Sequence, residues 1–168
     1  MIEFNDNFDN VENENIGGSS TLSEGWHKLE LREVGDVRRN AKGTCQGALF
    51  TFGGADGSFK LWLCVKAETS DALWMERKFK VIMHRIAQCV GVDNLRSTDD
   101  LIGKPFYANV TAREREYQVK NEVDIETGAP IMRKTVDNDF RNGKAGEVFL
   151  SCADYAQKYQ NFPFQFSK

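Results

Sequence analysis

Residues 58–91 read SFKLWLCVKAETSDALWMERKFKVIMHRIAQCVG, and this stretch decides the fold. Apolar residues alternate with Lys, Trp and Cys over residues 58–67, which predicts a β-strand with one buried face. The residues that follow predict an amphipathic helix that begins near Ser70 or Asp71 and ends at Gly91. Five apolar residues at helical spacing are expected to face the core: Met75, Phe79, Ile82, Ile86 and Val90.

Four more strands are predicted around this unit. Alternating apolar and polar residues place two strands before it, at 26–37 and 44–52, and two after it, at 106–112 and 117–125. The charged residues 113–116 are expected either to turn the chain between the last two strands or to extend a strand at the edge of the sheet. One helix between the third and fourth of five strands indicates a mostly β domain, an OB-fold-like β-barrel with one main α-helix and flexible termini.

Charge divides the chain into a tail and a body. The sequence carries 22 basic and 25 acidic residues, but residues 1–16 hold five acids and no base, which leaves 22 bases against 20 acids in the remainder. We therefore expect an acidic flexible tail over residues 1–20, a weakly basic barrel domain over 21–150 and an aromatic arm over 151–168. Pro163 favours an extended conformation for the end of the arm, residues 156–168.

The N-terminus and the cysteines indicate a cytoplasmic protein. Residues 1–15 lack the basic and apolar regions of a signal peptide, and no apolar run reaches the length of a membrane span. The cysteines are scattered, as expected for reduced core thiols: Cys45, Cys64, Cys89 and Cys152. His27 and His84 have no metal-ligand spacing, and no nucleophile motif or phosphate loop is present. We therefore expect no cofactor, no membrane association and no enzymatic activity.

Three clusters supply the aromatic and basic side chains with which proteins hold single-stranded nucleic acid. They lie on the third strand, in the loop after the first strand, and along the fourth and fifth strands: Lys60, Trp62 and Lys66; Arg38, Arg39 and Lys42; Tyr107, Arg113, Arg115, Tyr117 and Lys120. The second and third strands of an OB barrel form its binding face together with two adjacent loops. The three clusters are therefore predicted to share one face.

Each cluster also has a structural interpretation. Trp62 could instead cover a second small core, and Phe50 and Phe52 could pack under the helix. Residues 113–116 could be a solvent-exposed run of alternating charges. The aromatic arm suits a partner-binding or strand-exchange role, and it equally suits folding back on its own barrel.

Five short motifs agree in order and spacing with a known family. They are LSEGWHKLEL at 22–31, FKLWL at 59–63, IAQCVGV at 86–92, DDLIGKPF at 99–106 and KNEV at 120–123. Together they resemble small bacteriophage and prophage proteins found among replication and recombination functions, which include single-stranded-DNA-binding proteins. The resemblance covers residues 1–125. It departs where the family usually has Pro in place of Ser23, and residues 126–168 have no counterpart.

The residues and the resemblance lead to one expectation, a non-catalytic protein that coats single-stranded DNA in phage replication or recombination, regardless of sequence. Bases would stack on aromatic rings and phosphates would contact basic side chains, at Lys28, Arg32, Arg38, Arg39, Lys42, Phe52, Lys60, Trp62, Lys66, Tyr107, Arg113, Arg115, Tyr117 and Lys120. A homodimer and a replication or recombination protein of host or phage are the expected protein partners. The alternative is a phage-encoded protein-binding module that engages a host replication, recombination or defence protein through its arm and acidic tail.

Overall fold

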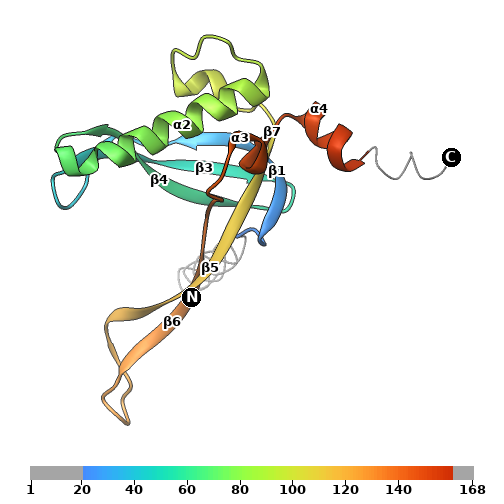
Figure 1. Ribbon diagram of the computed structural model, residues 1–168. Helices are drawn as coiled ribbons and strands as arrows, with labels where there is room; N and C mark the ends of the chain where they lie inside the picture. The colour runs from blue at the N-terminus through green and yellow to red at the C-terminus, as the bar shows by residue number, and fades with distance from the viewer. Residues whose placement is uncertain (1–20, 161–168) are drawn as a thin grey trace, which may run out of the picture.

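The computed structural model describes residues 21–160, with the exception of the side chains of residues 120–122. These residues form a mostly β structure with one long helix, as the sequence predicts (Figure 1). The acidic tail and the phenylalanines of the C-terminal arm, Phe162, Phe164 and Phe166, lie outside the described residues. The predicted boundary of the arm falls between β7 (Phe149–Leu150) and α4 (Cys152–Tyr155).

The strands form one antiparallel sheet of order β4-β3-β1-β5-β6. Two hairpins lie on either side of the central strand β1: β4 (Gly57–Ala67) with β3 (Cys45–Gly54), and β5 (Phe106–Val123) with β6 (Pro130–Phe140). The short strand β2 (Arg38–Arg39) continues along β3, and β7 continues along β5. The sheet therefore ends in two unpaired edges, one on β4 and one on β6.

The central strand β1 (Gly25–Val34) belongs to both halves of the sheet. Its residues 25–29 pair with β5 and its residues 30–34 pair with β3, with a register shift between Leu31 and Glu33. Such a bulge increases the local twist of a strand. In Figure 1, β5 and β6 accordingly run steeply across the direction of β3 and β4.

The long helix α2 (Leu73–Val90) covers the buried face of the sheet (Figure 1). Ile82 and Ile86 are buried as predicted, and Phe79 and Val90 pack partly buried against the same core. Met75 packs instead against a second, small cluster formed by two cysteines and an alanine: Cys45, Cys64 and Ala72.

Both ends of α2 use the backbone rather than side-chain caps. A 3₁₀ turn, η1 (Ser70–Ala72), leads into the helix, and no side chain makes a cap hydrogen bond at either start, so the predicted cap at Ser70 or Asp71 is wrong. Gly91 ends the helix with φ of 79°, as predicted. A second 3₁₀ turn, η2 (Thr98–Leu101), follows with Ser97 as its cap before the chain enters β5.

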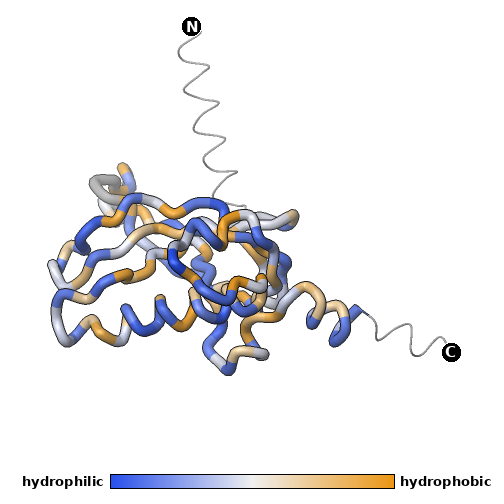
Figure 2. The backbone as a smooth tube through the Cα atoms, turned by 90° about the horizontal axis from the view of Figure 1, so that it is seen from above, coloured by the Kyte–Doolittle hydropathy of each residue, from blue (hydrophilic) through white to orange (hydrophobic). Residues whose placement is uncertain are grey.

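Phenylalanine rings form the centre of the core. One of them is Phe52, which was predicted to stack on a base. Phe52 is 0% exposed, and its ring centroid lies 5.0 Å from that of Phe140 and 5.6 Å from that of Phe59. Hydropathy alternates along the strands in Figure 2, as expected for a sheet with one buried and one exposed face. Phe52 lies on the buried face, so it cannot stack on a base.

In the second hairpin, the predicted fourth and fifth strands are one strand. Residues 113–116 form a strand extension, the second of the two predicted alternatives, and lie inside β5, which runs for 18 residues and pairs with the 11 residues of β6. Charged residues persist in these strands because they meet opposite charges across the ladder, as Arg115 meets Asp137 at 2.7 Å. The hairpin projects from the body of the molecule (Figure 1).

The described part of the C-terminal arm is helical rather than extended. After the short helix α3 (Ala145–Val148) and β7, the chain forms α4 and then a π-helical turn, η3 (Ala156–Gln160). Ser151 starts α4 by accepting a hydrogen bond from the N–H of Asp154. The expectation of an extended segment is therefore wrong up to residue 160, and Pro163 lies outside the described residues.

Candidate nucleic-acid interface

Trp62 lies on the exposed face of the β3–β4 hairpin. Its cross-strand neighbour is Leu49, and its indole covers Gly47, where a Cβ atom would overlap the ring. Trp62 is 37% exposed, and Leu49 beside it is 46% exposed. A partly exposed aromatic side chain of this kind is what a protein needs for stacking on a base.

A second tryptophan faces the same cleft. A cavity of about 540 Å³ is lined by Trp62, by the 40–44 loop and by the start of α2, including Trp74. Trp74 is 65% exposed. Trp74 was not among the predicted site residues, although it lies next to the predicted core position Met75 and outside the apolar stripe of the helix. Two aromatic rings on one cleft are a better platform for bases than the single ring that the sequence predicted.

Lys42 and Asp71 are the charged residues that line this cleft, and the other predicted bases lie farther from it. Arg39 holds Glu68 in a bidentate pair at 2.8 and 2.9 Å, and this hydrogen bonding keeps the pKa of the Glu68 carboxyl below its usual range. The remaining predicted bases of the first two clusters are exposed: Arg38, Lys42, Lys60 and Lys66. Lys42 lines the Trp62 cleft, and Arg38 lines the adjoining hollow between Trp62 and Leu49. The structure therefore brings Arg38 and Lys42 of the second cluster beside Trp62, whereas Lys60 lines the groove between β4 and β6.

Lys28 and Arg32 lie on a different part of the surface. They line a separate cavity of about 340 Å³ beside the tip of the β3–β4 hairpin. Arg32 donates to the carbonyl of Gly54 at 3.3 Å and lies 3.7 Å from the carboxylate of Glu30. These contacts fix the Arg32 side chain against the sheet, away from the Trp62 cleft.

The predicted site residue Tyr107 is covered. Its ring stacks on Tyr155 of α4 with centroids 3.7 Å apart and an angle of 5°. Trp26 and Tyr159 complete this aromatic cluster, at 6.0 Å from each other. Burial raises the pKa of the Tyr155 hydroxyl. The described part of the arm thus folds back on the outer face of β1 and β5, and it occupies the face of Tyr107 that was predicted to bind a base.

The third cluster lies along the β5–β6 hairpin. Arg115 is bound to Asp137, and its guanidinium lies 6.0 Å from the centre of the Tyr117 ring, which is 40% exposed. Arg113 is exposed one step closer to the body, and the side chain of Lys120 lies outside the described residues. Because these residues belong to a strand that extends past the core, they do not share a cleft with Trp62, and the three predicted clusters do not form one continuous site.

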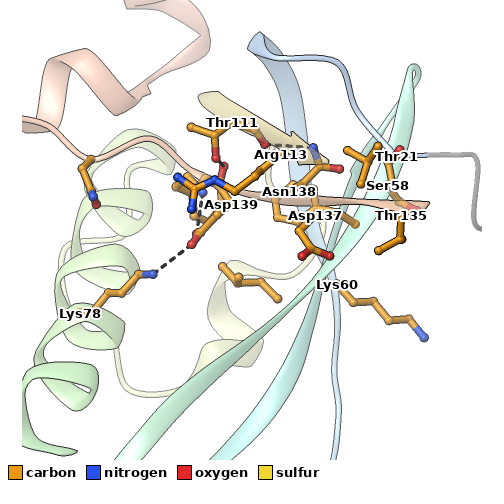
Figure 3. A pocket seen from close by; sticks show the side chains of 15 residues that line it. Thr21, Ser58, Lys60, Lys78, Thr111, Arg113, Thr135, Asp137, Asn138 and Asp139 are labelled. Carbon is orange, nitrogen blue, oxygen red and sulfur yellow. Dashed lines mark hydrogen bonds and ion pairs between the residues drawn. The ribbon is translucent and has the colours of Figure 1, made fainter. Parts of the chain in front are cut away.

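Figure 3 shows the groove between the two open edges of the sheet. It encloses about 780 Å³ and is lined by β4, β5 and β6, including Lys60 and Arg113. Lys78 of α2 is bound to Asp139 across it at 3.1 Å, and Thr111 donates to the Asp139 carbonyl at 3.2 Å. Acidic and basic side chains both line this groove, so its charge does not favour a polyanion.

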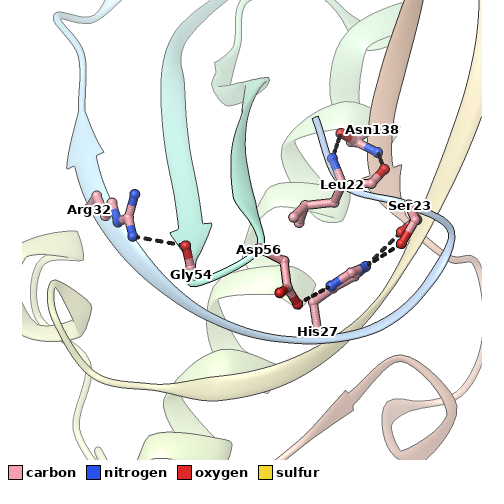
Figure 4. Close-up of polar contacts among 7 residues, drawn as sticks. All are labelled: Leu22, Ser23, His27, Arg32, Gly54, Asp56 and Asn138. Carbon is pink, nitrogen blue, oxygen red and sulfur yellow. Dashed lines mark hydrogen bonds and ion pairs between the residues drawn. The ribbon is translucent and has the colours of Figure 1, made fainter. Parts of the chain in front are cut away.

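A Ser-His-Asp arrangement near the start of β1 has a structural role (Figure 4). His27 is buried, with Nε2 2.7 Å from the Ser23 carbonyl oxygen and Nδ1 3.3 Å from Asp56. Because Nε2 faces this carbonyl acceptor, it is not free to take the proton of a nucleophile. Next to it, Asn138 holds both backbone groups of Leu22 at 3.0 and 2.9 Å. These contacts fasten residues 21–24 to the sheet.

The cysteines are free thiols in the described structure. Burial, with a contribution from the neighbouring Cys45, raises the pKa of the Cys64 thiol to about 11, and burial raises that of Cys89 to about 11. Thiols with such values are poor nucleophiles near neutral pH. Within residues 21–160, no group of three His, Cys, Asp or Glu side chains is placed to hold a metal ion.

Comparisons with known proteins add no relative to this picture. No protein-family model matches the chain, and neither a curated protein nor a solved structure matches it. The resemblance to phage single-stranded-DNA-binding proteins therefore stays a prediction. No helix within residues 21–160 combines the length and the apolar character needed to cross a membrane.

Proposed function

We propose that this protein binds single-stranded DNA without sequence preference. The observation that carries the proposal is the cleft between Trp62 and Trp74, which offers two partly exposed rings beside the basic side chains Arg38 and Lys42. Aromatic rings stack on any of the four bases, and cations beside them neutralise the phosphates. Such a surface needs no catalytic group, and its binding weakens as salt is added.

The strand order supports an open barrel of the OB type. In such a barrel, the second and third strands and the loop between the first two strands belong to the binding face. The long strands β3 and β4 take these positions, and α2 follows β4. The edges of β4 and β6 approach each other, with the rings of Phe59 and Phe140 5.7 Å apart. Trp62 then lies where an OB barrel holds its ligand.

A role in phage replication or recombination, inside the host cytoplasm, completes the proposal. It rests on the motifs that resemble phage proteins, which begin at residues 22–31. A homodimer and a replication or recombination protein of host or phage are the protein partners that this role implies.

A second candidate is a module that binds a host protein. It is favoured by the tip of the β5–β6 hairpin, where Val123 is 55%, Ile125 99% and Met132 53% exposed. Apolar side chains that gather at the end of a projecting hairpin are typical of protein interaction sites. The same hairpin is compatible with DNA binding at Trp62, so the two activities can coexist.

The test is tryptophan fluorescence during titration with single-stranded and duplex DNA at two salt concentrations. Quenching by the single strand alone, weakened by salt, would support the proposal because stacking brings a base against the indole ring. No change of fluorescence or of oligonucleotide anisotropy at low salt would refute DNA binding. Capture of a host protein through the hairpin tip would then favour the second candidate.

A further inference from the structure

A second basic groove follows one face of α2. Trp74, Arg77, Lys78, Val81 and Arg85 recur at helical spacing and line a cavity of about 310 Å³ together with the chain around residues 140–149. Arg141, just after β6, adds a fourth base. None of the residues that line this cavity is acidic.

The bases of this groove are only partly neutralised. Lys78 is bound to Asp139 at 3.1 Å, and Arg141 lies 3.8 Å from Glu24. Arg85 donates to the Gly143 carbonyl at 3.0 Å, which uses a neutral acceptor and leaves its charge.

Arg77 is exposed and has no ion pair within the described part of the chain. Three acids lie near the four bases, since the Glu147 carboxylate lies beside Gly143 in addition to Asp139 and Glu24. The bases still outnumber the acids, which leaves a net positive groove that suits a polyanion.

Trp74 connects this groove to the Trp62 cleft, because it lines both cavities. From Trp74 to Arg85 the helix rises about 16 Å at roughly 1.5 Å per residue. That length equals about five nucleotides at the stacked spacing of roughly 3.4 Å per nucleotide.

We propose that a single strand stacked at Trp62 continues past Trp74 along α2, with its phosphates on Arg77, Arg85 and Arg141. The inference rests on the proposed DNA binding and extends its site beyond the sheet. The helix α2 would then bind DNA with one face and pack on the core with the other.

The test compares the full-length protein with a variant that carries Arg77→Ala and Arg141→Ala. Arg96→Ala serves as a matched control, because Arg96 is exposed in the turn after α2 and lines neither cavity. Affinity is measured by anisotropy with oligothymidylates of about 4 and about 16 nucleotides, the limits of site size known for OB folds. Thermal unfolding of each protein shows whether the fold is retained.

We expect the double variant to bind the short oligonucleotide like the wild type and the long one more weakly. Its slope of log affinity against log salt for the long oligonucleotide should be about 1.4 less steep, since each lost contact to a single strand removes about 0.7. Equal affinities and slopes for wild type and double variant would overturn the α2 path while leaving DNA binding at Trp62 intact. An equal loss in Arg96→Ala would overturn it as well. Failure of the wild type to bind either oligonucleotide would refute the proposed function itself.

Discussion

Replacing Trp62 with Leu should weaken the binding of single-stranded DNA by about 1–3 kcal/mol, the cost of losing one base–aromatic stack. The variant keeps an apolar side chain over Gly47 but removes the flat ring. This choice matters because Trp62 is 37% exposed. Truncation to Ala would remove the buried part of the Trp62 side chain, as much as two-thirds of roughly 250 Å². At about 25 cal/mol per Å², this loss lowers the unfolding free energy by roughly 4 kcal/mol. That is a large part of a typical unfolding free energy of about 5–15 kcal/mol, whereas Leu keeps a good part of the contact.

The assay is the anisotropy of a labelled oligothymidylate at low salt, with urea unfolding measured in parallel. A loss of about 1–3 kcal/mol corresponds to a roughly 5- to 150-fold weaker affinity. Trp26→Leu is the matched control, because Trp26 packs against Tyr155 and Tyr159 on another part of the surface. It should leave the affinity for DNA unchanged.

Two results would refute this reasoning. A folded Trp62→Leu protein with wild-type affinity and wild-type salt dependence would mean that Trp62 only covers the hairpin. A matching loss of affinity in Trp26→Leu would mean that binding is not located at the Trp62 cleft.

Three further predictions concern the fold and its titrating groups. Gly54→Ala should lower the unfolding free energy by about 1–3 kcal/mol in urea, because a Cβ there would overlap the carbonyl oxygen of Lys28; wild-type stability would contradict this close approach. Glu76 accepts a hydrogen bond from the N–H of Ala67 at 2.9 Å, and this bond lowers the pKa of the Glu76 carboxyl in the folded state. The ionised carboxyl therefore stabilises the fold above the pKa that Glu76 has in the unfolded chain, and this stabilisation is lost as the pH falls through the pKa of the folded state. Urea curves of wild type and Glu76→Gln should therefore differ near neutral pH and converge in acid, and a constant difference would exclude the linkage. Cys152 should react first with a thiol reagent at mildly alkaline pH, and Cys152→Ser should abolish the fast phase, since the other three cysteines are more deeply buried or hold their protons more tightly.

Local patterns were sufficient for the first part of β4 and for α2. Alternation along residues 58–63 predicts which side chains of β4 point inward, and the spacing of Ile82 and Ile86 predicts the buried face of α2. Cys64 breaks the alternation, because it is buried in the small second cluster. The β5–β6 hairpin was not predictable in the same way. Residues 113–116 look like a turn because every one is charged, and their strand conformation depends on partners such as Asp137 that lie more than twenty residues later.

A residue of the candidate site was predictable only where the alternation of its own strand determines its exposure. Trp62 was assigned correctly to the exposed face, because its neighbours on β4 alternate clearly. Phe52 was assigned to the wrong face, although it alternates in step with the buried Phe50 and lies opposite the buried Phe59 of β4. The surroundings of Trp74 and Tyr107 depend on contacts between distant segments. Trp74 lines the cleft because α2 lies beside the 40–44 loop, and Tyr107 is covered because α4 packs on it.

The position of β1 between the two hairpins also determines the order in which this chain can fold. The β3–β4 hairpin closes between neighbouring residues, but Gly25 pairs with Val110, and Leu22 is held by Asn138, 116 residues away. Contacts so distant in sequence slow folding, because the chain loses the entropy of closing a long loop before the stabilising contacts form. On the ribosome, the N-terminal half of β1 would emerge long before its partner strand and wait with unpaired backbone groups. The N-terminal end of β1 is therefore fixed only after β6 has formed, because Asn138 of β6 binds the backbone of Leu22.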